Sequence, residues 1–112
     1  MLRNMLKSKI YNVVVNDVSI KCSSSIGIDK RLMEAVDIIE YEQVDVLNVR
    51  NGKRFTTYAI PIEAGISIYG AAARLVDIGD SLIILSYAAI NVTLSYQPKI
   101  VRGVDNENCN SD

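Results

Sequence analysis

The sequence predicts a small, mainly β domain, either a barrel or a sandwich, with one helix attached. Short runs rich in Val, Ile, Thr and Tyr recur along the 112 residues, and Gly, Asn or Asp separates most of them. Only one segment has the apolar spacing of a helix. A chain of this length folds as one domain and buries enough surface for a core without disulfides or metal.

Two strands are predicted near the start of the chain. Residues 9–15 are β-branched and aromatic, and Asn16-Asp17 supplies a turn after them. Residues 18–22 alternate apolar and polar positions, as a half-buried strand does. The side chains expected to point inward from this second strand are Val18, Ile20 and Cys22.

One helix is predicted, over residues 30–40. Asp29 precedes it and is a good N-cap, because its carboxylate can accept hydrogen bonds from the first free backbone N–H groups. A short apolar piece, residues 26–28, leads into this cap. The side chains expected on the buried face of the helix are Leu32, Met33, Val36 and Ile39.

A hairpin is predicted in the middle of the chain. Residues 43–49 alternate, and residues 54–60 form the return strand, which is expected to end near Pro61. Asn51-Gly52 lies between them and favours a two-residue type I′ turn, because both residues can adopt positive φ. The side chains expected inward on the first strand are Val44, Val46, Leu47 and Val49.

The second half predicts short strands separated by turns. The expected turns are 63–65 and 78–80, the expected strands are 67–69, 81–87 and 98–104, and residues 70–73 form a small-residue corner. The apolar run 81–87 is expected to be buried on both faces. The domain is expected to span 1–104 and the polar tail 105–112 to be disordered.

The composition argues against several functional classes. The formal net charge is −1, so a basic surface for nucleic acid is not indicated. Histidine is absent, which excludes Ser-His-Asp triads and most zinc sites, and no metal site is expected. Asp77 and Asp80 flank a glycine turn and are expected to be solvated.

The expected location is cytoplasmic. The sequence shows no signal sequence and no membrane span, and its two cysteines, Cys22 and Cys109, are therefore expected to be reduced thiols.

Three consecutive serines, residues 23–25, lie between a strand-like run and the helix. Serine is a poor nucleophile without an adjacent base. In a strained turn, however, a serine can attack the carbonyl carbon of the preceding residue and exchange the peptide bond for an ester. Elimination from that ester cuts the chain and leaves dehydroalanine, which hydrolyses to a pyruvoyl group, an electron acceptor comparable to PLP. Taken alone, such a triplet is usually only a polar turn.

Several separated stretches resemble the pyruvoyl-dependent aspartate 1-decarboxylases: "MLKSKI", "IGID", "NGKRFTTYAI", "GAAARLV" and, near the end, "YQP". The likeness runs from Met1 to about Val101, and "NGKRFTTYAI" is its most specific part. It implies a double-psi β-barrel assembled as a homotetramer. It also implies a self-made pyruvoyl cofactor and conversion of L-aspartate to β-alanine and CO2 for pantothenate synthesis. A maturation factor is left open as a further partner.

The resemblance implies roles for individual residues. Cleavage would fall between Ser24 and Ser25, giving chains of residues 1–24 and 25–112, and Ser25 would become the pyruvoyl group that forms a Schiff base with the substrate. Tyr58 would donate a proton after CO2 leaves. The residues implied in contacts with the substrate are Thr57, Gly70, Ala71, Ala72, Arg54 and Lys9. Neighbouring strand residues point to opposite faces, so Thr57 and Tyr58 can share a pocket only through a bulge or at a subunit interface.

The chain departs from the family pattern near the expected cut. Ser24 stands where the family usually has Gly, and Tyr69 where it has Asn, after a shorter loop. Tyr11 replaces a usual His and Cys22 a usual Tyr. These changes leave open an uncleaved or impaired proenzyme that acts only as an assembly module. A small DNA-binding barrel is a third reading, which the near-neutral charge disfavours.

Overall fold

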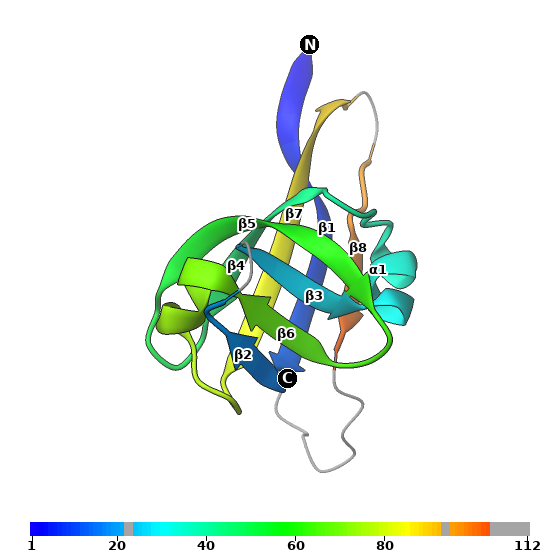
Figure 1. The fold of residues 1–112 in the computed structure, drawn as a ribbon. Coiled ribbons are helices and arrows are strands. Elements are labelled where there is room, and N and C mark those ends of the chain that lie inside the picture. Colours follow the sequence, from blue (N-terminus) through cyan, green and yellow to red (C-terminus); the bar gives the residue numbers. More distant parts are fainter. Residues whose placement is uncertain (22–23, 93–94, 104–112) are drawn as a thin grey trace.

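A computed structural model describes residues 1–21, 24–92 and 95–103 of the chain (Figure 1). The elements are β1 (Leu2–Val14), β2 (Asp17–Ser19), β3 (Ser25–Asp29), α1 (Lys30–Val36), β4 (Gln43–Asn48), β5 (Arg54–Ile62), β6 (Ile66–Tyr69), the 3-10 helix η1 (Gly70–Leu75), β7 (Ser81–Asn91) and β8 (Lys99–Arg102). The predicted mainly β fold with one or two short helices is confirmed.

All eight strands join one sheet in the order β2-β6-β3-β5-β4-β7-β1-β8. The pairs β2/β6, β3/β5 and β1/β8 are parallel and the others antiparallel, a mixture that fits the double-psi barrel implied by the resemblance. The long strands β1 and β7 pair along their length, and the N-terminal end of β1 projects away from the barrel (Figure 1). The register of β1 shifts twice, which bends the strand.

The core is aliphatic and includes side chains from six of the eight strands and from α1. Its buried residues are Ile10, Val13, Val15, Ile26, Ile28, Met33, Val36, Ile38, Val44, Val46, Ala59, Ile66, Ile68, Ala72, Ala73, Val76, Leu82 and Ile84. β3, expected only as a short apolar piece, is a central strand in which all five residues are buried. It pairs with β5 on one side and β6 on the other.

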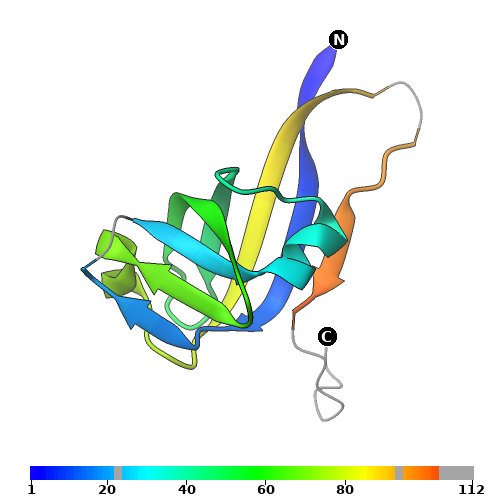
Figure 2. The same cartoon turned by 45° about the vertical axis from the view of Figure 1, so that its right-hand side comes forward.

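Helix α1 lies beside β8 and β1 (Figure 2). Asp29 caps it as predicted and accepts a hydrogen bond from the Arg31 N–H at 2.9 Å. The helix ends earlier than predicted, because Asp37 adopts the left-handed conformation with φ of 60°. Met33 is buried as expected, but Ile39 falls beyond the helix and is 66% exposed, so its predicted place in the core is wrong.

The loop between β4 and β5 differs from the predicted turn. Only Gly52 in the Asn51-Gly52 pair has positive φ, so the turn is not type I′. Instead the Gly52 N–H donates to the carbonyl of Asn48 at 2.8 Å, and the Asn48 side chain accepts from the Arg50 N–H at 3.0 Å. Hydrogen bonds from side chain to backbone therefore shape a wider loop. Val49 lies in it and is 59% exposed, contrary to the inward position predicted.

Several strand predictions also need correction. β1 begins at Leu2 rather than at residue 9, and β5 continues through Pro61 to Ile62. Ile20 lies after the end of β2 and is 57% exposed, not inward, while Cys22 lies outside the described residues. β7 is fully buried on one face only. The predicted corner at 70–73 is the start of η1.

A buried polar cluster joins the β4–β5 loop to the turn before β7. Asp80 is 7% exposed, so its predicted solvation is wrong. Its carboxylate accepts hydrogen bonds from Arg50 Nε at 2.6 Å and from Asn48 Nδ2 at 2.7 Å. Asn48 Nδ2 also donates to the carbonyl of Leu75 at 3.1 Å, which ties the end of η1 to this cluster. Hydrogen bonds from Arg50, the Asp77 N–H and Asn48 hold the pKa of Asp80 well below its usual range.

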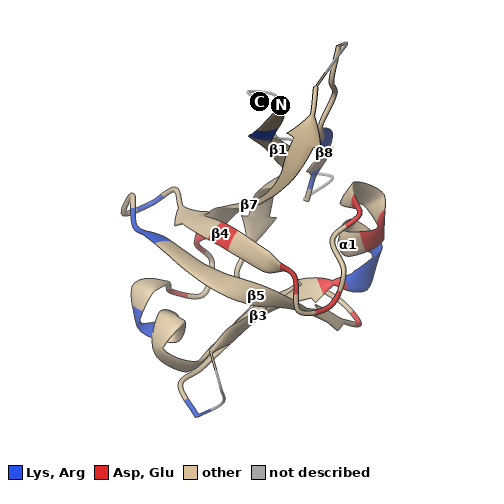
Figure 3. Cartoon of the chain, turned by 90° about the horizontal axis from the view of Figure 1, so that it is seen from above, with Lys and Arg blue, Asp and Glu red and all other residues tan. Residues whose placement is uncertain are grey.

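Charged residues of both signs are spread over several elements (Figure 3). Five cations in the described part of the chain are paired with carboxylates: Lys7, Lys30, Arg31, Arg50 and Arg54. This mixed distribution does not favour the DNA-binding alternative. A helix with the length and apolarity needed to span a membrane does not occur in the described residues.

We expect Asp80→Asn to lower the unfolding midpoint at pH 7. The pKa of Asp80 is lowered in the folded chain, so the stability it contributes is present above its unfolded pKa of about 3.9 and is lost as the pH falls toward the folded value. The difference from the parent should therefore shrink below about pH 4. Thermal unfolding measures this difference, in chains that all carry Ser25→Ala so that the cleavage implied by the resemblance would not divide the samples.

Asp77→Asn is the matched control, because the Asp77 side chain is 79% exposed although it pairs with the same Arg50 at 3.1 Å. An exposed pair contributes little. Equal losses of stability in the two variants would contradict a special role for the buried carboxylate.

Candidate active site

The expected cleavage segment lies against the junction of β6 and η1. Ser25 is the first residue of β3, is 6% exposed, and pairs with Tyr69 of β6. The preceding residue, Ser24, accepts a hydrogen bond at its Oγ from the Ala71 N–H at 3.3 Å. The peptide bond between the two serines is therefore held at the point where η1 begins. Ser23 and Cys22 lie outside the described residues.

Gly70 lies close against Ser24 of this segment. Its φ is +77°, a conformation that side chains oppose. A Cβ added there would lie 2.6 Å from both Cα and Oγ of Ser24. Only glycine can therefore occupy this position without displacing Ser24. The resemblance implies a role for Gly70, and the geometry supplies the steric reason.

One cavity joins four of the predicted site residues. It has a volume of about 400 Å³ and lies between β5, η1 and the residue before β3. Its lining residues are Ser24, Phe55, Thr56, Thr57, Ala71, Ala72, Arg74 and Leu75. Ser24, Thr57, Ala71 and Ala72 thus meet in space, although up to 48 positions separate them in the chain (72 − 24).

Thr57 has an unusual hydroxyl. Its Oγ1 is buried and has no hydrogen-bond partner among the described residues. Buried hydroxyl groups are normally paired, because an unpaired one loses its interaction with water without compensation. The neighbouring Thr56 differs, since its Oγ1 donates to Asp45 Oδ1 at 2.7 Å. An unsatisfied hydroxyl at a cavity is available to a reacting group.

Tyr58 lies in an adjoining cavity of about 540 Å³, which shares Thr56 and Thr57 with the first. Its ring centre is 6.0 Å from that of Tyr41, with a tilt of 46° between the rings. Tyr41 has φ of 73°, which is unusual for an aromatic residue, and its N–H donates to the carbonyl of Ala59 at 2.8 Å. Thr57 and Tyr58 both border this cavity in one chain although the register of β4 and β5 is continuous, so the prediction that they need a bulge or a subunit interface to share a pocket is wrong.

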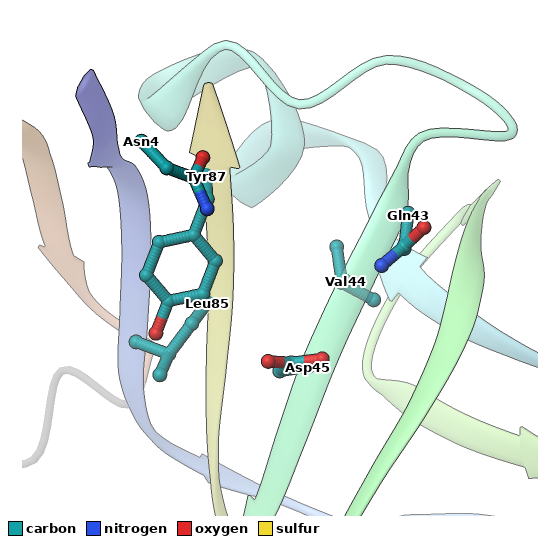
Figure 4. Close-up of a pocket in the computed structure, with 6 residues that line it drawn as sticks. All are labelled: Asn4, Gln43, Val44, Asp45, Leu85 and Tyr87. Carbon is teal, nitrogen blue, oxygen red and sulfur yellow. The ribbon is translucent and has the colours of Figure 1, made fainter. Parts of the chain in front are cut away.

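Arg54 is engaged elsewhere in this single chain. Its Nη2 donates to Asp45 Oδ2 at 2.9 Å and approaches the Tyr87 hydroxyl at 3.5 Å. Asp45 and Tyr87 border a third cavity of about 380 Å³ (Figure 4). Its lining residues are Asn4, Gln43, Val44, Asp45, Leu85 and Tyr87. Hydrogen bonds from Thr56 and then Arg54 hold the pKa of Asp45 below its usual range.

Lys9 lies on β1, four strand positions from β3 in the sheet order. It does not border the cavities that contain Ser24 or Tyr58 in the described part of the chain. Its Nζ lies 5.8 Å from the centre of the Tyr11 ring, one of the residues that depart from the family pattern. The single chain therefore does not bring Lys9 or Arg54 to the cavity that holds Ser24.

Comparison of the whole chain with known proteins identifies its family. The family model described as aspartate decarboxylase matches residues 1–110. This chain belongs to the aspartate decarboxylase family. It is 49% identical to the aspartate 1-decarboxylase of Thermoanaerobacter pseudethanolicus, over 90% of this chain and 91% of that protein. It is 50% identical to the aspartate 1-decarboxylase of Kosmotoga olearia, over 91% of this chain and 91% of that protein. It is 44% identical to the aspartate 1-decarboxylase of Ralstonia pickettii, over 90% of this chain and 88% of that protein.

Three residues that line these cavities were not predicted from the sequence: Asp45, Arg74 and Tyr41. Asp45 could have been found, since it lies directly opposite Thr56 across the hairpin and diagonal to Arg54. Arg74 could have been found by extending the "GAAA" segment through one more helical residue. The sequence carries no signal for the unusual backbone of Tyr41.

We expect Gly70→Ala to be more destabilising than Gly52→Ala. Both glycines have positive φ, 77° and 73°, so both variants share the cost of a left-handed alanine, about 1–2 kcal/mol. Only the new Cβ at 70 meets other atoms, because nothing lies within 4 Å of the one at 52. Urea unfolding of the uncut Ser25→Ala chain measures the difference, and equal losses would show that residue 70 has room.

Proposed function

We propose that this chain cuts itself between Ser24 and Ser25 and then decarboxylates L-aspartate to β-alanine and CO2. Its membership of the aspartate decarboxylase family supports the overall reaction. The observation that carries the proposal is the cavity where Ser24, the unpaired hydroxyl of Thr57 and the start of η1 meet. The predicted cytoplasmic location, homotetramer and maturation factor stay predictions.

The cleavage chemistry needs a nucleophile and a group that stabilises charge on an oxygen. The Oγ of Ser25 would attack the carbonyl carbon of Ser24, the C–N bond would break, and the amide would become an ester with a free amine on residue 25. Loss of the Cα proton and rupture of the Cβ–Oγ bond would release Ser24 as a carboxylate. Hydrolysis of the remaining dehydroalanine would release ammonia and leave the pyruvoyl group.

Thr57 is suited to assist the first step. The carbonyl oxygen of Ser24 gains negative charge during attack, and a hydroxyl donor aimed at it would lower the barrier. Thr57 borders the same cavity as Ser24, and its buried Oγ1 has no hydrogen-bond partner among the described residues. Gly70 leaves the space that this segment occupies, since any side chain there would displace it. These two observations support a fit between the site and a pyruvoyl group at residue 25.

A pyruvoyl group supplies an electron-accepting carbonyl that reacts with the substrate amine, and it can delocalise the electron pair of the broken C–C bond. The chain's own residues would bind and orient the substrate and move one proton. Arg54 would hold the carboxylate that is retained, through two parallel hydrogen bonds. Tyr58 would donate the proton that replaces CO2. Lys9 and the backbone of Ala71 and Ala72 would complete the binding surface.

Assembly of several copies of the chain would explain how residues that do not border the Ser24 cavity in one chain could still take part in the reaction. Arg54 and Lys9 lie away from the Ser24 cavity in one chain, and Tyr58 lies in the adjoining one. A homotetramer could bring these side chains from a neighbouring copy. Arg54 would then exchange part of its interaction with Asp45 for the substrate carboxylate. Gel filtration of the purified protein tests the assembly directly.

The second candidate is an uncleaved proenzyme, and Ser24 and Tyr69 favour it. The position of the Tyr69 ring weakens that argument, because its Cε2 lies 3.3 Å from where a Cβ on Gly27 would be. Gly27 therefore leaves room for a ring that is larger than the usual Asn. Intact mass spectrometry of the denatured protein separates the two candidates. Two chains split after Ser24, the larger one starting in a pyruvoyl group, support the enzyme, and one uncut chain after prolonged warming supports the proenzyme.

We expect Thr57→Val to slow self-cleavage by about a hundredfold, because a single well-placed donor to a developing oxyanion contributes about that much. The rate is followed by intact mass spectrometry at fixed temperature. Thr56→Val is the control: it removes a neighbouring hydroxyl that is already bonded to Asp45. If both variants mature at the parental rate, Thr57 does not assist the cleavage.

We expect Tyr58→Phe to leave cleavage intact and to lower kcat for β-alanine release by roughly 10²–10⁴. Phenylalanine keeps the ring and its contact with Tyr41 but removes the proton to be donated. Tyr41→Phe is the control for a general effect on this cavity. A Tyr58→Phe enzyme with parental kcat would assign the proton to another group.

A further inference from the structure

The cavity that holds Ser24 contains a cation with no role in the chemistry above. Arg74 borders it together with Ser24, Thr57 and Ala71. Within residues 1–21, 24–92 and 95–103, its guanidinium makes no ion pair with a carboxylate. Arg54 differs in this respect, because Asp45 already engages it. Among the described residues that line this cavity, Arg74 is thus the one cation, and no carboxylate pairs with it.

The geometry of η1 places Arg74 on the same edge of this helix as Ala71. Side chains three residues apart eclipse each other in a 3-10 helix. Arg74 therefore shares one edge of η1 (Gly70–Leu75) with Ala71. Ala71 is the residue whose N–H donates to Ser24 Oγ at 3.3 Å. This edge of η1 therefore contacts Ser24 through Ala71 and carries the positive charge of Arg74 one helical turn later.

Cleavage changes the charge of this cavity. Before it, Ser24 is joined to Ser25 by a neutral amide; after the Cβ–Oγ bond breaks, Ser24 ends in an α-carboxylate. The new anion forms at a residue that lines the cavity with Arg74. A guanidinium can bind it through two parallel hydrogen bonds, which an ammonium group cannot provide.

We propose that Arg74 binds a carboxylate in this cavity, and that the carboxylate is the one that cleavage leaves on Ser24. The proposal rests on the self-cleavage proposed above. The substrate carries the same chemical group, so its retained carboxylate is the other source, and the experiment separates the two. Arg74 then acts as a positioning residue that holds the new end of the short chain beside η1.

A cation in the last turn of a helix has an ordinary explanation, since it also interacts with the free carbonyl groups there. That interaction does not depend on whether the chain has been cut. The test therefore measures the pKa of the Ser24 carboxylate directly. In protein labelled with [1-13C]serine, Ser24 is the one serine of residues 1–112 whose labelled carbon becomes a carboxylate on cleavage, because the carbonyl carbon of every other serine in this range stays amide-linked.

We expect Arg74→Gln to raise the pKa of the Ser24 carboxylate, followed by 13C NMR, by about 0.2–0.7 units, as for an exposed ion pair. Arg74→Lys should restore part of the difference. Salt at 1 M, where the Debye length is about 3 Å, should remove most of it. Lys99→Gln is the matched control, because Lys99 is exposed on β8 and does not border the cavity.

The Michaelis constant for L-aspartate, measured on fully cut protein, identifies the source. An unchanged KM with a shifted Ser24 titration assigns the Ser24 carboxylate. A KM raised severalfold in Arg74→Gln, without a shift of that titration, assigns the substrate carboxylate instead. If neither quantity moves relative to Lys99→Gln, Arg74 binds no carboxylate and the proposal is overturned.

A chain that never cuts itself would reject the proposed function, and Arg74 is then tested separately. In the uncut Ser25→Ala chain the cavity has no carboxylate of its own, so added succinate should shift one arginine Nε–H NMR signal. That signal should be missing from the Ser25→Ala, Arg74→Gln double variant. A titration in which no Arg74 signal responds would reject carboxylate binding independently of cleavage.

Discussion

The contact between Gly70 and Ser24 is the constraint on which the arrangement of the site depends. Because a Cβ at residue 70 would lie 2.6 Å from Ser24, the chain can turn from β6 into η1 here only with a glycine at positive φ. That turn presents the Ala71 N–H to Ser24 Oγ and sets η1 over one side of the cavity. The opposite side is β5, which carries Thr57. The need for glycine at residue 70 thus helps to set how η1 and β5, the two sides of the cavity, lie relative to each other.

The far end of η1 is fixed by a different kind of interaction. The side-chain amides of Asn48 and Asn51 both donate to the carbonyl of Leu75 at 3.1 Å, and Asp80 with Arg50 holds Asn48 in place. These residues belong to the β4–β5 loop and to the turn before β7. Since β5 begins directly after that loop, one polar cluster connects both walls of the cavity. Damage to this cluster would therefore act on the site without touching the reacting atoms.

Predictions from the sequence succeeded where the signal is local. The alternation of Val44 and Val46 identified buried positions, and Asp29 was correctly identified as a helix cap. They failed where a distant partner decides: Asp80 is buried because Arg50, thirty positions away, neutralises it. For the site, the resemblance named Ser24, Thr57, Ala71 and Ala72, and the structure places all four at one cavity, a grouping that no periodicity in the chain could predict. Lys9 does not border this cavity, because it lies on β1; Arg54 does not border it either, although it lies on β5, and its guanidinium is bonded to Asp45.

The departures from the family pattern are coupled to one another in space. Tyr69 pairs with Ser25, yet its ring extends over Gly27, where any larger residue would meet both Tyr69 and Ile62. The Ser24 hydroxyl, absent from a glycine, lies beside Gly70, which has no side chain to displace it, and accepts a hydrogen bond from the Ala71 N–H. Each added side chain therefore has a place that leaves the Ser24–Ser25 peptide bond at the start of β3 and beside the cavity. For this reason the substitutions argue for an altered rate of maturation more strongly than for its loss.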